Sequence, residues 1–141
     1  MISTKGRYAL RVVIDIAENE NGSPIRLSDV AIRQEISLKY LELIIPSLTK
    51  AGIVSSSHGK GGGYKLNTSP AELKVGDVIR AAEGELAPVA CLKCDALPCD
   101  RALKCKTLGV WQEYYRLTNA YFDSITVADV INGDIAFNPH D

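Results

Sequence analysis

The sequence predicts a mainly α-helical protein that carries one small β-hairpin and a long helix near its end. Apolar residues recur at the spacing of amphipathic helices in segments 4–19, 27–34, 37–52, 75–84 and 107–124. Between the third and fourth of these segments, residues 53–57 and 64–66 are β-branched or small and flank a glycine-rich turn, which is typical of two paired strands. A hairpin directly after two closely spaced helices indicates a winged helix-turn-helix, and we expect that fold here.

The first two predicted helices are joined by a polar turn. The amphipathic pattern of residues 4–19 ends at the run 19–24, which holds a glycine and a proline. A short second helix is expected over residues 27–34, with Ser28 as the residue that caps its first turn. Residues 35–36 then leave room only for a tight connection to the third helix.

The third predicted helix begins after Ser37, whose side chain suits an N-cap. Pro46 lacks a backbone N–H and is expected to kink this helix late or to end it, and Gly52 suits its C-terminal cap. In a helix-turn-helix, this second helix of the pair enters the major groove of DNA. The apolar face that we expect to meet the core consists of Leu38, Leu41, Ile45 and Leu48.

The turn between the predicted strands reads HGKGGGYKL, and two phosphate-binding interpretations of it fail. A Walker loop needs Ser or Thr where this chain has Gly61, and a dinucleotide loop needs a glycine where it has Tyr64. A wing fits better, because glycines permit a close approach to a DNA phosphate while His58 and Lys60 supply contacts. A plain flexible hairpin is the alternative.

The remaining segments contain two more helices and a loop. A long helix is expected over about residues 107–124 and a short one over residues 126–131. The segment before them is rich in polar residues and holds two prolines, so we expect a loop there. The chain accordingly divides into a winged helix-turn-helix with a linking helix (1–84), a cysteine-rich loop (85–106), a dimerisation helix with a short last helix (107–131) and a loosely held tail (132–141).

The long helix carries a wide stripe of aromatic and apolar residues. A monomer of this size rarely exposes a contiguous apolar patch as large as this stripe. The stripe packs either on the chain's own core or against a second copy of the helix, and we expect the second arrangement and so a homodimer. The stripe consists of Trp111, Tyr114, Tyr115, Thr118, Tyr121, Phe122 and Ile125.

The net charge of −1 conceals an uneven distribution along the chain. Residues 1–65 hold nine Lys and Arg against six Asp and Glu, a net charge of +3, whereas residues 66–141 have a net charge of −4. A basic first half fits a double-stranded DNA partner, although the excess is mild.

The candidate DNA-binding residues lie at the starts of the first and third helices and in the glycine turn. Because phosphate repels a carboxylate, Glu42 is expected either to accept a hydrogen bond from N4 of cytosine or to be an ordinary solvated side chain. The full set is Lys5, Arg7, Ser37, Lys39, Tyr40, Glu42, His58, Gly59, Lys60 and Gly61.

All four cysteines lie in the stretch ACLKCDALPCDRALKC, residues 90–105. A disulfide is disfavoured, because no signal peptide is visible and the cytosol keeps thiols reduced. Zinc stays open, although only one close Cys-x-x-Cys pair is present where structural zinc sites usually have two. A thioredoxin-like pair lacks its α/β unit, and common ferredoxin spacings do not match. The residues alone indicate a metal or cluster site formed by Cys91, Cys94, Cys99 and Cys105.

The sequence shows no catalytic constellation. Its only histidines are His58 in the turn and His140 beside the C-terminus, and the spacing supports no nucleophile–base pair or carboxylate pair. No run of residues approaches the roughly 18 apolar residues of a membrane span. We therefore expect a cytoplasmic protein that is not an enzyme and has neither a membrane nor a small-molecule substrate as partner.

Several motifs occur in an order that resembles one protein family along nearly the whole chain. They are STKGRYAL, SLKYLE, GGGY, VGDVIRAAEG, the loop cysteines and Trp111 in the long helix. With this combination the chain resembles the IscR-type (Rrf-type) bacterial winged-helix transcriptional regulators, which include IscR, NsrR, RirA and CymR, and its cysteines make it IscR-like. The resemblance implies a repressor that binds a palindromic DNA operator as a homodimer.

The resemblance also implies an iron–sulfur cluster on the cysteine loop that changes operator affinity. IscR-type members have a histidine where this chain has Leu108, and NsrR-type members have an acidic residue where it has Tyr8. We therefore expect Cys94 to be the fourth ligand, and the similarity to IscR favours a two-iron (2Fe-2S) over a four-iron cluster. A zinc-stabilised DNA-binding protein and a small iron–sulfur carrier are the alternatives. The cysteines that match the family's ligands are Cys91, Cys99 and Cys105.

Overall fold

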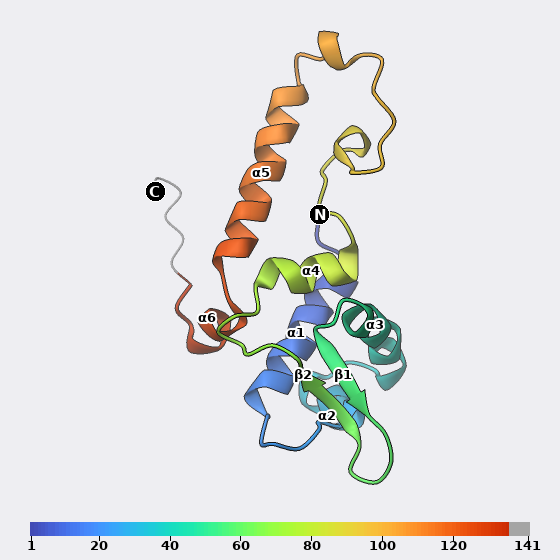
Figure 1. Ribbon diagram of the computed structural model, residues 1–141, viewed down its shortest axis with the longest axis vertical. Helices are drawn as coiled ribbons and strands as arrows, with labels where there is room; N and C mark the ends of the chain where they lie inside the picture. Colours follow the sequence, from blue (N-terminus) through green and yellow to red (C-terminus); the bar gives the residue numbers. More distant parts are fainter. Residues whose placement is uncertain (136–141) are drawn as a thin grey trace.

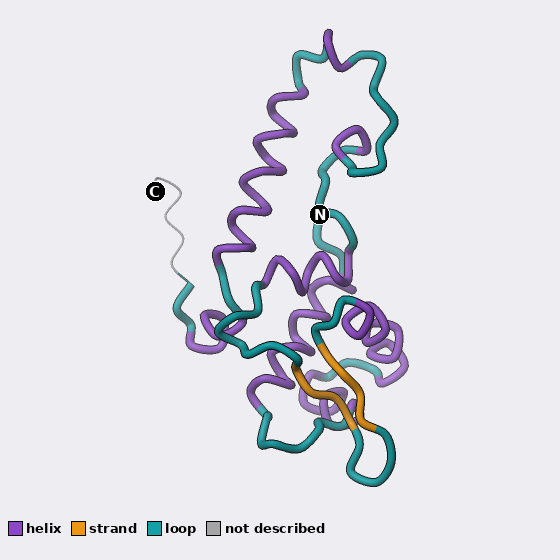
Figure 2. Tube along the Cα trace, in the orientation of Figure 1, coloured by secondary structure: helices purple, strands orange, loops and turns teal. Residues whose placement is uncertain are grey.

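The computed structural model describes residues 1–135 of the chain. Residues 136–141 of the predicted tail, with His140, lie outside the described residues. The fold is mainly α-helical with one antiparallel two-stranded hairpin, which confirms the predicted fold class (Figures 1 and 2). The elements are α1 (Thr4–Glu18), α2 (Leu27–Gln34), α3 (Leu38–Lys50), β1 (Val54–Ser57), β2 (Gly63–Leu66), α4 (Val75–Glu83), α5 (Leu108–Ser124) and α6 (Val127–Asn132), with short 3-10 turns at Ala90–Leu92 and Ala102–Lys104.

Helix α1 supplies the central face of the main hydrophobic core. Its apolar residues recur at helical spacing, so one side of the helix is buried along its whole length. Side chains from α2, α3, β1 and α4 pack with this face in a single cluster. The α1 residues concerned are Ala9, Val12, Val13 and Ile16, none more than 1% exposed.

A buried carboxylate fastens α2 to α1. Asp15 is only 1% exposed, and its two oxygens accept hydrogen bonds from Arg33 Nη2 at 2.6 Å and from Gln34 Nε2 at 2.9 Å. A buried charge requires partners of this kind. Glu35 then ends α2 with a φ of 54°, in the left-handed region, which produces the predicted tight connection to α3.

Two details of α2 and α3 differ from the sequence prediction. Ser28 lies inside α2 and makes no capping hydrogen bond, because the helix already begins one residue earlier. Leu38 is 41% exposed while Ile44 is fully buried, because Leu38 is the first residue of α3 and lies beyond the end of the core. Of the two outcomes expected at Pro46, the structure excludes an end of the helix, because α3 continues to Lys50. The predicted cap is confirmed, since Ser37 Oγ accepts from the backbone N–H of residue 40 at 3.2 Å.

The hairpin is held against the helices by a second, isolated pairing. Its strands pair antiparallel with Val54 opposite Leu66. Ile25, just before α2, exchanges two backbone hydrogen bonds of 2.8 Å with Tyr64 of β2. A Cβ atom on Gly63 would lie 2.4 Å from the carbonyl oxygen of Ile25, so this close approach needs glycine. The turn of the hairpin projects from the body of the molecule (Figure 1).

The end of α4 caps the start of α1. The Glu83 carboxylate accepts hydrogen bonds from the backbone N–H groups of Ser3 at 2.7 Å and Gly6 at 3.1 Å. A carboxylate there satisfies unpaired donors and is stabilised by the helix dipole. A Cβ atom on Gly6 would lie 2.3 Å from Glu83 Oε1, which explains the glycine of the motif STKGRYAL.

Helix α5 extends away from the body, whereas α6 returns to it (Figure 1). Arg80 of α4 holds α5 through Asn119, with Nη1 and Oδ1 2.9 Å apart, and through Asp123. Val127 of α6 is fully buried in the main core, and its N–H donates to the carbonyl oxygen of Leu73 at 2.9 Å. Although α6 directly follows the long helix in sequence, it therefore packs with the N-terminal body. Among the described residues, no helix is long and apolar enough to cross a membrane.

Candidate functional site

The outward face of α3 carries a mixed set of side chains. Spacings of three and four residues place them along one stripe, opposite the buried face. Within residues 1–135, the side chain of Glu42 has no ion pair or hydrogen bond, so its carboxylate is available to a ligand of this helix. The exposed residues of the stripe are Lys39, Glu42, Leu43, Pro46 and Lys50.

Besides Ser37, whose hydroxyl caps α3, three of the predicted DNA-binding side chains already make contacts within the chain. Tyr40 is half-buried, with its ring edge-on to that of Tyr8 and the ring centroids 5.5 Å apart. Lys5 Nζ donates to Ser47 Oγ at 3.0 Å, so this lysine lies against α3. Arg7 bonds a neighbouring threonine at 3.2 Å but stays exposed. Tyr40 therefore packs α3 onto α1, whereas the stripe around Glu42 faces outward.

The wing turn presents its predicted residues to solvent. Gly59 and Gly61 have φ values of 92° and 80°, in the left-handed region that other residues rarely adopt. A Cβ atom on Gly62 would lie 2.3 Å from a backbone carbonyl oxygen. The glycines thus determine the shape of the turn, and His58 and Lys60 are exposed on it.

Three of the four cysteines share one cavity. Cys91, Cys99 and Cys105 line a cavity of about 240 Å³ whose remaining wall includes Leu108 and Gln112 from the first turns of α5. All four thiols are exposed and none forms a disulfide. In the conformation described for residues 1–135, no three Cys, His, Asp or Glu side chains are close enough to hold one metal ion.

Cys94 lies outside this cavity and next to Glu85. Its backbone N–H donates to both oxygens of the Glu85 carboxylate, at 2.9 and 3.1 Å. A hydrogen bond between the Cys94 side chain and this carboxylate, together with its charge, raises the pKa of Cys94, and the backbone contact lowers the pKa of Glu85. Tyr115 of α5 also donates to Glu85, at 3.1 Å, so one carboxylate joins the loop to α5.

The pKa of Cys105 is shifted in the opposite direction to that of Cys94. The sulfur of Cys105 lies 3.4 Å from the hydroxyl of Thr107. Hydrogen bonds from this hydroxyl and from the Thr107 backbone lower the pKa of Cys105. The thiolate, which is the form that binds metals, is therefore favoured at a cysteine that lines the cavity.

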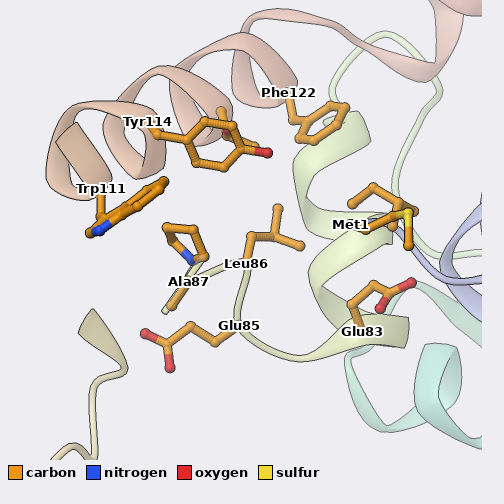
Figure 3. Close-up of a pocket in the computed structure, with 11 residues that line it drawn as sticks. Met1, Glu83, Glu85, Leu86, Ala87, Trp111, Tyr114 and Phe122 are labelled. Atoms are coloured by element: carbon orange, nitrogen blue, oxygen red, sulfur yellow. The ribbon is translucent and has the colours of Figure 1, made fainter. Parts of the chain in front are cut away.

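A groove of about 380 Å³ runs beside α5, from Trp111 to Phe122. Trp111, Tyr114 and Phe122 form one wall of the groove, and the segment around Leu86 with Met1 forms the other. Figure 3 shows the three rings along α5 opposite Leu86. Trp111 is 39% and Tyr114 51% exposed, so this wall keeps a large apolar area in solvent.

The other residues of the predicted dimer stripe divide between two surroundings. Thr118 lines the groove, and the rings of Tyr121 and Phe122 lie 5.4 Å apart. Ile125 is only 9% exposed and packs with Val75 and Ile79 of α4. The chain turns back to the body at this point, so Ile125 belongs to the chain's own core, which corrects its placement on a surface between two copies.

A comparison of the whole sequence with protein families agrees with this arrangement. The profile of the Rrf2 family, described as an iron-dependent transcriptional regulator, matches residues 2–133. The chain belongs to the Rrf2 family. The predicted resemblance is thus confirmed, and this Rrf2 protein is a DNA-binding regulator of transcription and not an enzyme.

Individual Rrf2 relatives resemble the chain over most of their length. The transcriptional regulator IscR of Escherichia coli is 34% identical over 131 residues, which cover 93% of this chain and 80% of the relative. The structure of IscR from T. potens has a TM-score of 0.75 at 34% identity and covers 98% of this chain and 93% of that one. CymR, the global cysteine regulator of B. subtilis, has a TM-score of 0.74 at 34% identity, with 94% and 97% covered.

The sequence patterns did not identify two features of this Rrf2 protein. Glu85 carries no motif, and only the folded chain brings it to Cys94 and Tyr115. Val110 and Leu117 are 60% and 52% exposed and were not included in the α5 stripe. A spacing of 4, 3 and 4 residues through 110, 114, 117 and 121 was the signal that could have identified them.

Proposed function

We propose that this Rrf2 protein is a transcriptional repressor that senses iron–sulfur cluster or redox status through its cysteine loop. The observation that supports this most strongly is that Cys91, Cys99 and Cys105 line one cavity against the start of α5. Thiolates are the usual protein ligands of iron–sulfur clusters. The proposed active form is a homodimer that binds a palindromic operator in the cytoplasm, where bacterial DNA lies.

The donor set fits such a cluster in its chemistry. Three sulfur atoms share a cavity with mostly apolar walls, and the lowered pKa of Cys105 favours its thiolate. Because the thiols do not yet form a metal-binding group, the loop has to contract around the ligand. A bound cluster supplies redox-active iron, and its gain or loss is the proposed signal.

Ligation by all four cysteines requires Cys94 to leave Glu85 and join the other thiols. The similarity to IscR favours a two-iron cluster in this site. Under this hypothesis, Cys94→Ser lowers the iron and sulfide content and changes the visible absorbance of protein purified without oxygen. Unchanged absorbance and stoichiometry would instead show that the fourth donor is another residue.

The loop adjoins the elements that would carry its signal. Glu85, at the start of the loop, accepts hydrogen bonds from Cys94 and from Tyr115 of α5, so a movement of the loop acts on α5. Arg80 in turn joins α5 to α4 through Asn119. A contraction of the loop thus changes the angle between α5 and the DNA-binding body, and ligand binding shifts the population of that angle.

The DNA-binding surface is formed by the outward stripe of α3 and by the wing. In this proposal α3 enters the major groove, and Glu42 accepts a hydrogen bond from N4 of cytosine. Exposed cations at Arg7, Lys39 and Lys60 contact phosphates and make binding dependent on salt. A palindromic operator follows from the two-fold symmetry of a homodimer.

Purification without oxygen tests the proposal directly. Iron, zinc and acid-labile sulfide are measured, and operator binding is compared before and after removal of the cluster. We expect iron with sulfide and a clear change in operator affinity. Zinc without sulfide would favour a zinc-stabilised DNA-binding protein, and a cluster without operator binding in either state would favour an iron–sulfur carrier.

A further inference from the structure

Leu43 is a large apolar side chain that α3 holds in solvent. It is 64% exposed, more than Leu38 at 41%, the other exposed leucine of this helix. The opposite face already supplies the core with Leu41, Ile44 and Leu48, which are fully buried, so the core does not need Leu43. On an ordinary surface a single exposed leucine needs no explanation, but this one lies among the residues that face DNA in the proposed function.

The charged and apolar side chains around Leu43 are arranged as the surface of a DNA groove requires. Lys39, Leu43, Pro46 and Lys50 follow one another at spacings of four, three and four residues, with Glu42 beside them, so they form one exposed stripe. The two lysines lie toward the ends of the stripe and the apolar side chains between them. Anionic phosphates border the groove of DNA, so cations at the ends and an apolar centre complement its rims and its floor.

The floor of the major groove offers one apolar group, the C5 methyl of thymine. Leucine has no hydrogen-bond donor or acceptor in its side chain, so it distinguishes base pairs only through contact with this methyl. We propose that Leu43 contacts the methyl group of a thymine beside the base pair that Glu42 reads, and thereby determines operator specificity. This inference rests on the proposed binding of α3 in the major groove.

Replacing thymine by deoxyuridine tests the contact, because it removes only the C5 methyl group. A duplex is first selected by the full chain from a random-sequence pool, and each thymine in its protected region is then replaced singly by deoxyuridine. Deoxyuridine pairs as thymine does but lacks the methyl. At one thymine position in each half-site we expect the affinity of the wild-type protein to fall about fourfold, the equivalent of ~0.8 kcal/mol for one buried methyl group.

Three variants show whether Leu43 is responsible for the preference for thymine over deoxyuridine. Leu43→Ala should bind the thymine and deoxyuridine duplexes equally, whereas Leu43→Met keeps an apolar reach and should keep the preference. Ile32→Ala removes a side chain that is 77% exposed on α2 and should retain the full wild-type preference. Because Leu43 is exposed, thermal unfolding of Leu43→Ala should match that of the wild type, which separates a lost contact from a lost fold.

The outcomes separate this inference from the proposed function. If the wild type is indifferent to deoxyuridine at every position, or if Leu43→Ala retains the thymine preference, the inference is wrong and the proposed function stands. If no duplex is selected with or without a cluster, the proposed function and this inference are both wrong.

Discussion

At the scale of single residues, the thiols of the cysteine loop differ in acidity. The contact with Glu85 raises the pKa of Cys94, and the contact with Thr107 lowers the pKa of Cys105. Only the thiolate is a strong nucleophile, and both cysteines are exposed, so acidity and not access controls their reaction. Near neutral pH, iodoacetamide should therefore alkylate Cys105 before Cys94 in cluster-free protein, as followed by peptide mass spectrometry.

The alkylation of the two cysteines should depend on pH in a definite direction. Since the folded protein raises the pKa of Cys94, its alkylation should begin at a higher pH than that of Cys105. Glu85→Gln removes the carboxylate charge and should bring the reaction of Cys94 to lower pH without affecting Cys105. Equal rates at the two cysteines of the wild type across the titration would contradict this assignment.

A second prediction at this scale concerns Glu42, which is exposed and whose side chain forms no hydrogen bond or ion pair within the described residues. Glu42→Ala should remove discrimination of about 1–3 kcal/mol at one operator base pair. The salt dependence should stay the same, because Glu42 neutralises no phosphate. Lys60→Ala is the contrasting variant, since it should weaken all operators alike and, with one Lys60 in each protomer of the proposed homodimer, reduce the salt slope by about two. An equal loss on every operator for Glu42→Ala would exclude a base-reading role.

At the scale of elements, local chemistry made most of the fold predictable. The Ser37 cap places the start of α3, and the glycine-rich turn indicates the hairpin. The capping of α1 by Glu83, 80 residues beyond Ser3, leaves no trace in any local pattern. Periodicity also shows that α6 is a helix but not that it packs with α1, because a sequence pattern reports the buried face and not what covers it. For the same reason the pairing of Cys94 with Glu85 was not predicted.

The connection between loop and helix gives the prediction at this scale. Glu85→Ala removes the acceptor shared by Cys94 and Tyr115, so the state of the loop should no longer act on α5. The ratio of operator affinities with and without the cluster should fall toward one, a loss of about 1–3 kcal/mol of coupling. In cluster-free protein, the amide of Cys94 should exchange hydrogen faster in this variant.

The matched control is Glu72→Ala, which removes an exposed carboxylate from the body, away from the loop. It should leave both the affinity ratio and the hydrogen exchange of the loop unchanged. A Glu85→Ala protein that still responds fully to the cluster would show that the signal takes another route.

At the scale of the whole molecule, the proposed homodimer requires a second copy of the chain to pack on the exposed face of α5. Val110, Tyr114 and Leu117 are 60%, 51% and 52% exposed, on a helix that extends away from the body (Figure 1). Together with Tyr121 they repeat at alternating spacings of four and three residues, the pattern by which two helices pack side by side. We therefore place the centre of the proposed dimer contact at these residues, beside the groove of Trp111.

Leu117→Glu tests this placement, because a carboxylate buried between two paired helices costs several kcal/mol. A cost of about 3 kcal/mol corresponds to a weakening of dimerisation by roughly a hundredfold. Sedimentation should then show a monomer where the wild type is a dimer, and affinity for a palindromic operator should fall while a circular dichroism spectrum keeps its helical shape. Leu103→Glu changes a fully exposed loop leucine and should leave the dimer intact. A Leu117→Glu protein that remains dimeric would place the contact on another face, and loss of the dimer with unchanged operator affinity would show that each body binds its half-site independently.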